Sequence, residues 1–137
     1  MKRASKLVLI LSLVFLAGCN LLAMSKEKRT NTLDDFLFAM RWHEFDAAAS
    51  QMLPELQDDF MAIFQDMDDL QIIEMRTTKR VAEVEGRKLK VTVEMDYYLL
   101  PSVAIKTFRF DQTWLFYDPE EGPLHGYYIT TPFPAFP

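Results

Sequence analysis

Apolar residues recur three or four positions apart between residues 32 and 49, which is the period of a helix with a buried face. Thr32 followed by Asp35 has the spacing of a capping box, so a first helix is predicted to begin there. Its main apolar stripe is Leu33, Phe36, Leu37 and Met40. A second stripe, Phe38, Trp42 and Phe45, predicts that the helix is sandwiched between other parts of the protein.

The helical pattern is expected to break near His43, and Pro54 marks the next boundary. After Pro54 the apolar residues lie on one side of the predicted helix and the polar residues on the other, as in an ordinary amphipathic helix. The apolar side consists of Leu53, Leu56, Phe60, Ile63, Phe64 and Met67.

After Asp69 the period changes from helical to alternating, which predicts half-buried antiparallel strands. The apolar faces of the two clearest strands are Leu89, Val91, Val93, Met95 and Tyr97, then Phe108, Phe110, Trp114 and Phe116. A last strand is predicted from Tyr127 to Thr131, after the turn-rich residues 118–123.

Matching the apolar faces of neighbouring strands fixes their predicted register. A turn at Pro101 and Ser102 pairs Leu89 with Trp114, Val93 with Phe110, Glu94 with Arg109, Met95 with Phe108 and Thr92 with Asp111. A loop over residues 84–86, with Gly86 in the left-handed conformation, pairs Met75 with Met95, Arg76 with Glu94 and Val81 with Leu89. The same register sets Glu74 against Asp96 and Arg80 against Lys90, and both pairs are unfavourable.

Helices followed by a meander of long strands predict an α+β domain with N-terminal helices packed on a curved antiparallel sheet. This order resembles the nuclear transport factor two-like superfamily, also called cystatin-like. The residues that carry the resemblance are 40–49, similar to the passage between the first two helices of that fold, and the late strand pair within 114–129. The resemblance implies a cone-shaped domain and supports fold better than function.

Residues 1–18 have the pattern of a secretory signal peptide: Lys2, Arg3 and Lys6 precede an apolar run, Leu7 to Leu16, that is too short to span a bilayer. The ending Leu16-Ala17-Gly18-Cys19 resembles the lipobox of bacterial lipoproteins. The resemblance implies that Cys19 carries diacylglycerol and a further acyl chain such as palmitate. Residues 19–31 are then the lipidated cysteine and a tether, and residues 32–137 a single domain. In lipoproteins of Gram-negative bacteria an aspartate after the cysteine tends to retain the protein at the inner membrane. The resemblance therefore implies that a chain with Asn20 there is placed in the outer membrane, facing the periplasm.

Charge is unevenly distributed along the chain, whose net charge is -5. The signal peptide and tether are basic, so the domain is strongly acidic, and nucleic acid is not expected as a partner. Residues 30–69 contain ten acids against Arg41 alone. This segment is either a solvated helical surface or a docking surface for a basic envelope protein.

Candidate chemistry is sparse. Cys19 is the only cysteine, and its lipidation would remove cysteine catalysis and disulfides. His43 and His125 lack the spacing of metal ligands, so neither a metal nor another cofactor is expected. Alternation assigns Asp111 to the outer face of the sheet, where it is a surface charge rather than a catalytic base. Seven residues are expected either to line a cavity for a small apolar ligand in the mouth of the cone or to pack solidly: Phe38, Trp42, Met75, Met95, Tyr97, Phe110 and Trp114.

The proline-rich ending, residues 131–137, is expected to be extended and to tuck Phe133 and Phe136 against the body of the domain. A free arm that binds another envelope protein is the alternative. The sequence as a whole predicts a membrane-anchored, non-catalytic binding or interaction module of the cell envelope. The alternative is a small cone-fold enzyme of isomerase or dehydratase type, which would need a carboxylate pointing into the cone.

Overall fold

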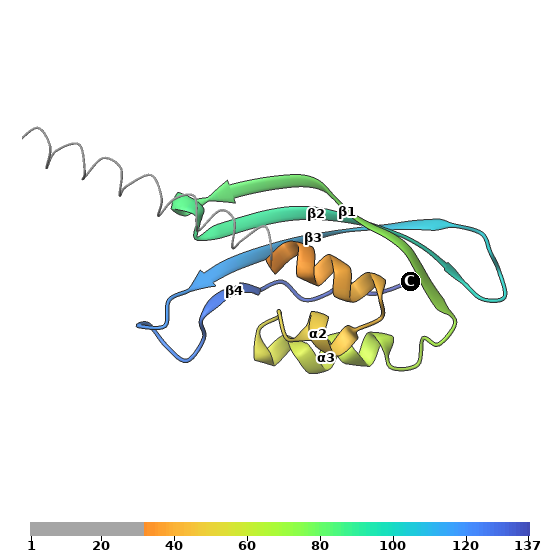
Figure 1. Ribbon diagram of the computed structural model, residues 1–137, viewed down its shortest axis with the longest axis horizontal. Coiled ribbons are helices and arrows are strands. Elements are labelled where there is room, and N and C mark those ends of the chain that lie inside the picture. The colour runs from red at the N-terminus through yellow and green to blue at the C-terminus, as the bar shows by residue number, and fades with distance from the viewer. Residues whose placement is uncertain (1–31) are drawn as a thin grey trace, which may run out of the picture. The chain divides into compact units, whose positions relative to one another are not determined.

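Helices cover one face of a four-stranded antiparallel sheet in the computed structural model, which describes residues 32–137 (Figure 1). The helices are residues 32–41, α2 (Phe45–Ala49) and α3 (Pro54–Phe64). The strands, in the order in which they lie side by side, are β1 (Leu70–Glu83), β2 (Lys88–Leu99), β3 (Lys106–Tyr117) and β4 (Gly126–Ile129). The α+β class predicted from the element order is therefore confirmed. The predicted leader and tether lie outside the described residues.

The break at His43 is a Schellman motif that ends the first helix. The backbone N–H of Glu44 donates to the carbonyl of Ala39 at 2.8 Å, and that of His43 donates to the carbonyl of Met40 at 3.2 Å. His43 has φ of 59°, in the left-handed region that the motif requires at this position. The prediction of a boundary at His43 is confirmed.

The helix 32–41 buries only one of its two apolar stripes. Phe36 and Met40 are fully buried, whereas Phe38 is 58% and Trp42 62% exposed. The prediction that this helix is sandwiched is therefore wrong. At about 3.6 residues per turn, Phe38 and Trp42 lie on the side opposite Phe36 and Met40, and the sheet covers only the latter side.

The register of β2 against β3 is the predicted one, from Leu89 opposite Trp114 to Met95 opposite Phe108. Along β1, Met75 faces Met95 and Glu74 faces Asp96 as predicted.

The predicted pairing of β1 with β2 is wrong beyond Thr77, where Val81 faces Lys90 rather than Leu89. An irregularity at Thr78 adds one residue to β1, and this also separates Arg80 from Lys90. Between β1 and β2, Gly86 has the predicted left-handed φ (83°), and Val84 and Glu85 also have positive φ.

The edge of β4 is covered by the segment that joins α2 to α3. The backbone N–H of Leu53 donates to the carbonyl of Ile129 at 3.0 Å, and that of Ile129 donates to the carbonyl of Gln51 at 2.8 Å. Met52, beside this junction, is fully buried. The core therefore lies between the inner face of the sheet and the helices, and its largest fully buried side chains are Trp114, Phe36, Phe60, Leu33, Met40, Met52, Leu70, Met95, Ile129 and Val93.

Candidate functional site

The seven residues predicted to line a cavity are divided between the core and the surface. Met95, Tyr97, Phe110 and Trp114 are buried on the inner face of the sheet, and Met75 is partly buried beside them. Phe38 and Trp42 are instead exposed on the first helix, where their ring centroids lie 6.0 Å apart. The structure thus brings five of the seven to the inner face and separates the other two from them.

The C-terminal tail packs on this inner face. The ring of Phe133 lies 4.8 Å from that of Phe110 and 5.3 Å from that of Phe64, measured between centroids. The ring of Phe136 lies 4.8 Å from that of Tyr97. These contacts confirm the prediction that the tail tucks both phenylalanines against the body. The tail therefore occupies the space between α3 and the sheet where a ligand in the mouth of the cone would contact Tyr97 and Phe110.

The outer face of the sheet has a nearly buried carboxylate held between two arginines. Glu94 is only 7% exposed, although it belongs to the polar side of β2. Arg76 Nε on β1 donates to Glu94 Oε2 at 3.0 Å, and Arg109 Nε on β3 donates to Glu94 Oε1 at 2.9 Å. The sequence predicted both pairs through the register. It did not predict the burial, which arises because the two guanidinium groups cover the carboxylate.

A second acid extends this network toward the turn between β2 and β3. Asp96 accepts hydrogen bonds from Arg76 and from Thr107 Oγ1, both at 2.5 Å. Arg76 also approaches Glu74 at 3.6 Å, which offsets the repulsion between Glu74 and Asp96. Arg76 and Arg109 balance the charges of Glu94 and Asp96, which favours a structural role over a free catalytic acid.

The arginines set the pKa values of both carboxyl groups. Hydrogen bonds from Arg109, and then from Arg76, hold the pKa of Glu94 below its usual range although partial burial opposes the shift. The pKa of Asp96 is lowered mainly by the hydrogen bond from Arg76 and also by that from Thr107. The same contacts raise the pKa of Arg76 above its usual value. Glu94 and Asp96 are therefore anionic at neutral pH.

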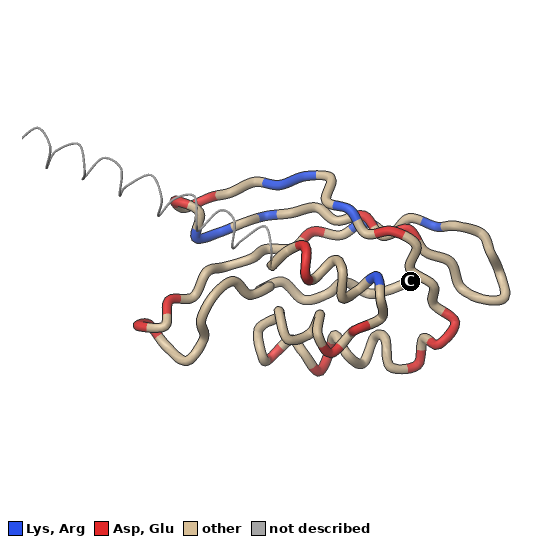
Figure 2. The backbone as a smooth tube through the Cα atoms, in the orientation of Figure 1, with Lys and Arg blue, Asp and Glu red and all other residues tan. Residues whose placement is uncertain are grey.

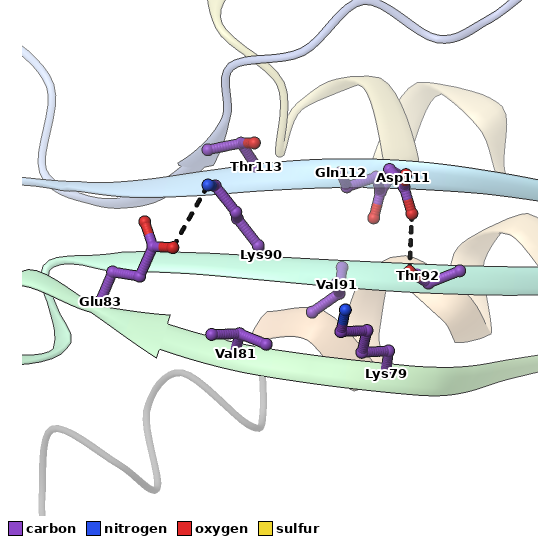
Figure 3. A pocket seen from close by; sticks show the side chains of 9 residues that line it. All are labelled: Lys79, Val81, Glu83, Lys90, Val91, Thr92, Asp111, Gln112 and Thr113. Atoms are coloured by element: carbon purple, nitrogen blue, oxygen red, sulfur yellow. Dashed lines mark hydrogen bonds and ion pairs between the residues drawn. The ribbon is translucent and has the colours of Figure 1, made fainter.

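A pocket of about 490 Å³ lies on the same outer face, farther along the strands (Figure 3). Lys90 is paired with Glu83 at 3.2 Å, and Thr92 Oγ1 donates to Asp111 at 2.6 Å. Asp111 is exposed and lies opposite Thr92, so its predicted place on the outer face is confirmed. This carboxylate does not point into the cone, where an isomerase-type base would have to lie.

The acids of the helical part behave differently from those of the sheet. All ten acids between residues 30 and 69 are exposed, and none forms an ion pair with another described residue: Asp34, Asp35, Glu44, Asp46, Glu55, Asp58, Asp59, Asp66, Asp68 and Asp69. Figure 2 shows these acids along the helices and the turn before β1, whereas Lys and Arg gather on the strands. The helical surface therefore has an uncompensated negative charge.

The turn between β2 and β3 exposes aliphatic side chains that the sequence pattern did not predict to be functional. Leu100 is 48%, Val103 76% and Ile105 65% exposed. The sequence does carry a sign of this apolar turn, because residues 97–105, around the predicted turn, contain no charged side chain. Such runs at a hairpin tip are unusual because turns are normally polar.

Among residues 32–137, no group of three or more His, Cys, Asp and Glu side chains is placed to hold a metal ion. Within the same residues, no helix combines the length and apolar character that crossing a bilayer requires. The candidate surfaces are thus the acidic helical side, the pocket on the sheet and the apolar hairpin tip.

Comparison with known proteins supports the fold. No family model matches the sequence, and no curated protein matches it either. A proposed polyketide cyclase from Xanthomonas campestris pv. campestris is similar in structure, with a TM-score of 0.50 and 12% identity over 78% of this chain and 92% of that one. A SEC-C motif protein from Rhodopseudomonas palustris also has a TM-score of 0.50, with 14% identity over 68% of this chain and 67% of that one. At such identities the likeness concerns the fold, which is the cone-shaped α+β arrangement.

Proposed function

We propose that the protein is a lipid-anchored component of the cell envelope that docks a basic protein partner and has no catalytic activity of its own. The anchor is supported by the ending Leu16-Ala17-Gly18-Cys19 of the apolar leader. Docking rather than ligand storage is supported by the tail phenylalanines, which occupy the mouth of the cone. In a Gram-negative cell the proposed place is the outer membrane, on its periplasmic side.

The observation that carries the docking proposal is an exposed stripe on the first helix. This acidic aromatic stripe consists of Asp34, Asp35, Phe38 and Trp42. Asp34, Phe38 and Trp42 follow one another at four-residue intervals, so their side chains lie in line on one side of the helix. The two rings contact each other, and neither acid forms an ion pair with a described residue.

This combination suits lysine and arginine side chains. Carboxylates accept charge-assisted hydrogen bonds from them, and the face of a tryptophan or phenylalanine ring attracts the same cations. Aromatic residues are also enriched at protein interfaces and often contribute most of the binding energy. The acids of α2 and α3 would add long-range attraction and speed the encounter with a basic surface.

A small ligand inside the cone is a second candidate, favoured by unsatisfied polar atoms. Trp114 Nε1 and Gln112 Oε1 are buried on the inner face of β3 and have no hydrogen-bond partner among the described residues. A ligand with one acceptor and one donor would satisfy both. An isomerase or dehydratase remains the enzymatic alternative. Of the described residues, the buried polar ones are Glu94 and Gln112, and Glu94 is on the outer face.

Photo-cross-linking in the host tests the docking proposal. A benzophenone amino acid placed at Phe38 in the membrane-bound protein should give a specific protein product, whereas the same group at the exposed Val84, in the turn between β1 and β2, should not. Asp34→Asn with Asp35→Asn should abolish that product. Glu85→Gln with Glu120→Gln, which removes the same charge from other exposed positions, should leave it.

A product that persists in the Asp34→Asn, Asp35→Asn chain, or that forms equally at residue 84, would contradict the proposed surface. Native mass spectrometry of the mature protein purified from its host separates the alternatives. A stoichiometric protein rich in lysine and arginine supports docking, and a co-purifying small molecule supports the cone site.

A further inference from the structure

The turn between β2 and β3 forms an apolar finger, which we define as residues 100–105. It projects from the end of the sheet, on the right in Figure 1, and contains no charged residue. Val103 is 76% and Ile105 65% exposed, whereas the buried valines and isoleucines of the sheet are at most 9% exposed. Exposed branched aliphatics at a hairpin tip are costly in water unless something else covers them.

The base of the finger is held firmly. Asp96 and Thr107, on the two strands that lead into the turn, are joined by a hydrogen bond of 2.5 Å. The backbone N–H of Leu100 donates to the carbonyl of Asp69 at 2.9 Å. Within the turn, Ser102 Oγ accepts from the backbone N–H of Ala104 at 3.3 Å. The aliphatic side chains are therefore presented by an ordered turn, and little entropy remains to be lost when they are buried.

We propose that this finger dips into the boundary between headgroups and acyl chains of the membrane to which the chain is anchored. The proposal rests on the proposed anchor. A lipid surface deforms around the three exposed aliphatic side chains of the tip, whereas a protein partner would need a groove of matching shape. Lys106 follows the finger directly and is exposed, so its ammonium group can remain among the lipid phosphates.

The length of the chain before the domain makes this contact possible. The twelve residues 20–31 span at most about 40 Å when extended. A twelve-residue strand such as β3 is also about 40 Å long, so the finger end of the sheet is within reach of the membrane. A weak insertion suffices, because the anchor keeps the finger at a high effective concentration near the lipid.

The charges around the finger predict how the contact responds to conditions. Asp66, Asp68 and Asp69 precede β1 and are exposed near Leu100, to which Asp69 is hydrogen-bonded. These acids oppose an approach to anionic lipid, so insertion must be driven by the aliphatic side chains. The contact should therefore persist at high salt and on zwitterionic vesicles.

Fluorescent labelling of the full-length lipoprotein tests the proposal. Cys19 carries lipid in the mature chain, so an introduced cysteine is the only thiol available to an environment-sensitive dye. Val103→Cys places the dye on the finger. Val84→Cys places it at an exposed position at the tip of the hairpin between β1 and β2. Both chains are reconstituted into vesicles of phosphatidylethanolamine and phosphatidylglycerol, or of phosphatidylcholine.

The dye at residue 103 should shift its emission to the blue on both vesicle types and be quenched by nitroxide-labelled lipids, whereas the dye at residue 84 should show neither effect. Equal, water-like emission at both positions in vesicle-bound protein would overturn the finger contact and leave the anchor intact. Undiminished flotation of a Cys19→Ser chain would overturn the anchor while the contrast between the two dyes still reports on the finger. A labelled chain that does not float at all would overturn both.

Discussion

The ring of Phe133 packs 4.8 Å from the ring of Phe110, so the last residues of the chain occupy the inner face of its own sheet. Phe136 extends the same packing to Tyr97. The tail thus acts as part of the core although its prolines prevent it from joining the sheet. The two tail rings cover Tyr97 and Phe110 in the mouth of the cone, and they link the end of the chain to the stability of the whole domain.

Phe136→Ala should lower the free energy of unfolding by about 3 kcal/mol, because it removes a ring that is buried among other aromatic side chains. Denaturant unfolding with a spectroscopic signal gives the value directly. Ala135→Ser, at the exposed neighbouring position, should change it by less than about 0.5 kcal/mol. Equal stability of the Phe136→Ala chain and the parent would mean that the tail does not contribute to the core in solution.

The network around Glu94 predicts a loss of stability in acid. The pKa values of Glu94 and Asp96 are lowered in the folded state, chiefly by hydrogen bonds from Arg109 and Arg76 respectively. Their contribution is therefore fully present above the ordinary carboxyl pKa of about 4 and is lost as the pH falls through the folded-state values. Glu94→Gln should be less stable than the parent at pH 7.

The difference in stability between the two chains should shrink as the pH falls below about 4 toward the lowered folded-state pKa values of Glu94 and Asp96, at which the parent carboxylates become protonated. Equilibrium unfolding at a series of pH values measures this. Glu120→Gln serves as a control, because Glu120 is exposed and outside the network. If the difference in free energy of unfolding between the parent and the Glu94→Gln chain stays constant across the acidic range, the two arginines do not stabilise the charge on Glu94.

His43→Gly should raise the free energy of unfolding by about 0.5 to 1 kcal/mol. Its left-handed φ of 59° is costly for a residue with a Cβ, and glycine adopts it without strain. The gain is partly offset by the greater freedom of glycine in the unfolded chain and by the lost stacking of His43 on Phe45. Thermal unfolding of the two chains side by side suffices, and a lower melting temperature for the variant would show that the stacking dominates.

Cys19→Ser should release the protein from membranes, because the lipobox cysteine would no longer accept a lipid. Fractionation of host cells and intact-mass measurement of the membrane-bound form check this together. The parent should carry the mass of its acyl groups at Cys19. A membrane-bound parent with a free thiol, or an uncleaved leader, would rule out lipidation at this residue.

The sequence by itself determined the class of the fold and the pairing of β2 with β3. Alternation of large apolar residues permits few registers, so Glu94 opposite Arg109 followed from the pattern alone. The break at His43 and the left-handed Gly86 were also readable, because each results from local backbone preferences. For the N-terminal segment, the sequence is the whole basis of the proposed anchor.

The tertiary structure decided which apolar residues are inside. Periodicity placed Phe38 and Trp42 in a second buried stripe, but the protein has a layer on only one side of that helix. The bulge at Thr78 depends on the twist of the completed sheet, so no local pattern could locate it. The burial of Glu94 requires arginines from two different strands, and the packing in the mouth of the cone requires a tail that returns to the sheet from the end of the chain. Such long-range contacts depend on which distant segments pack on the same surface. The spacing of residues within one segment does not predict this.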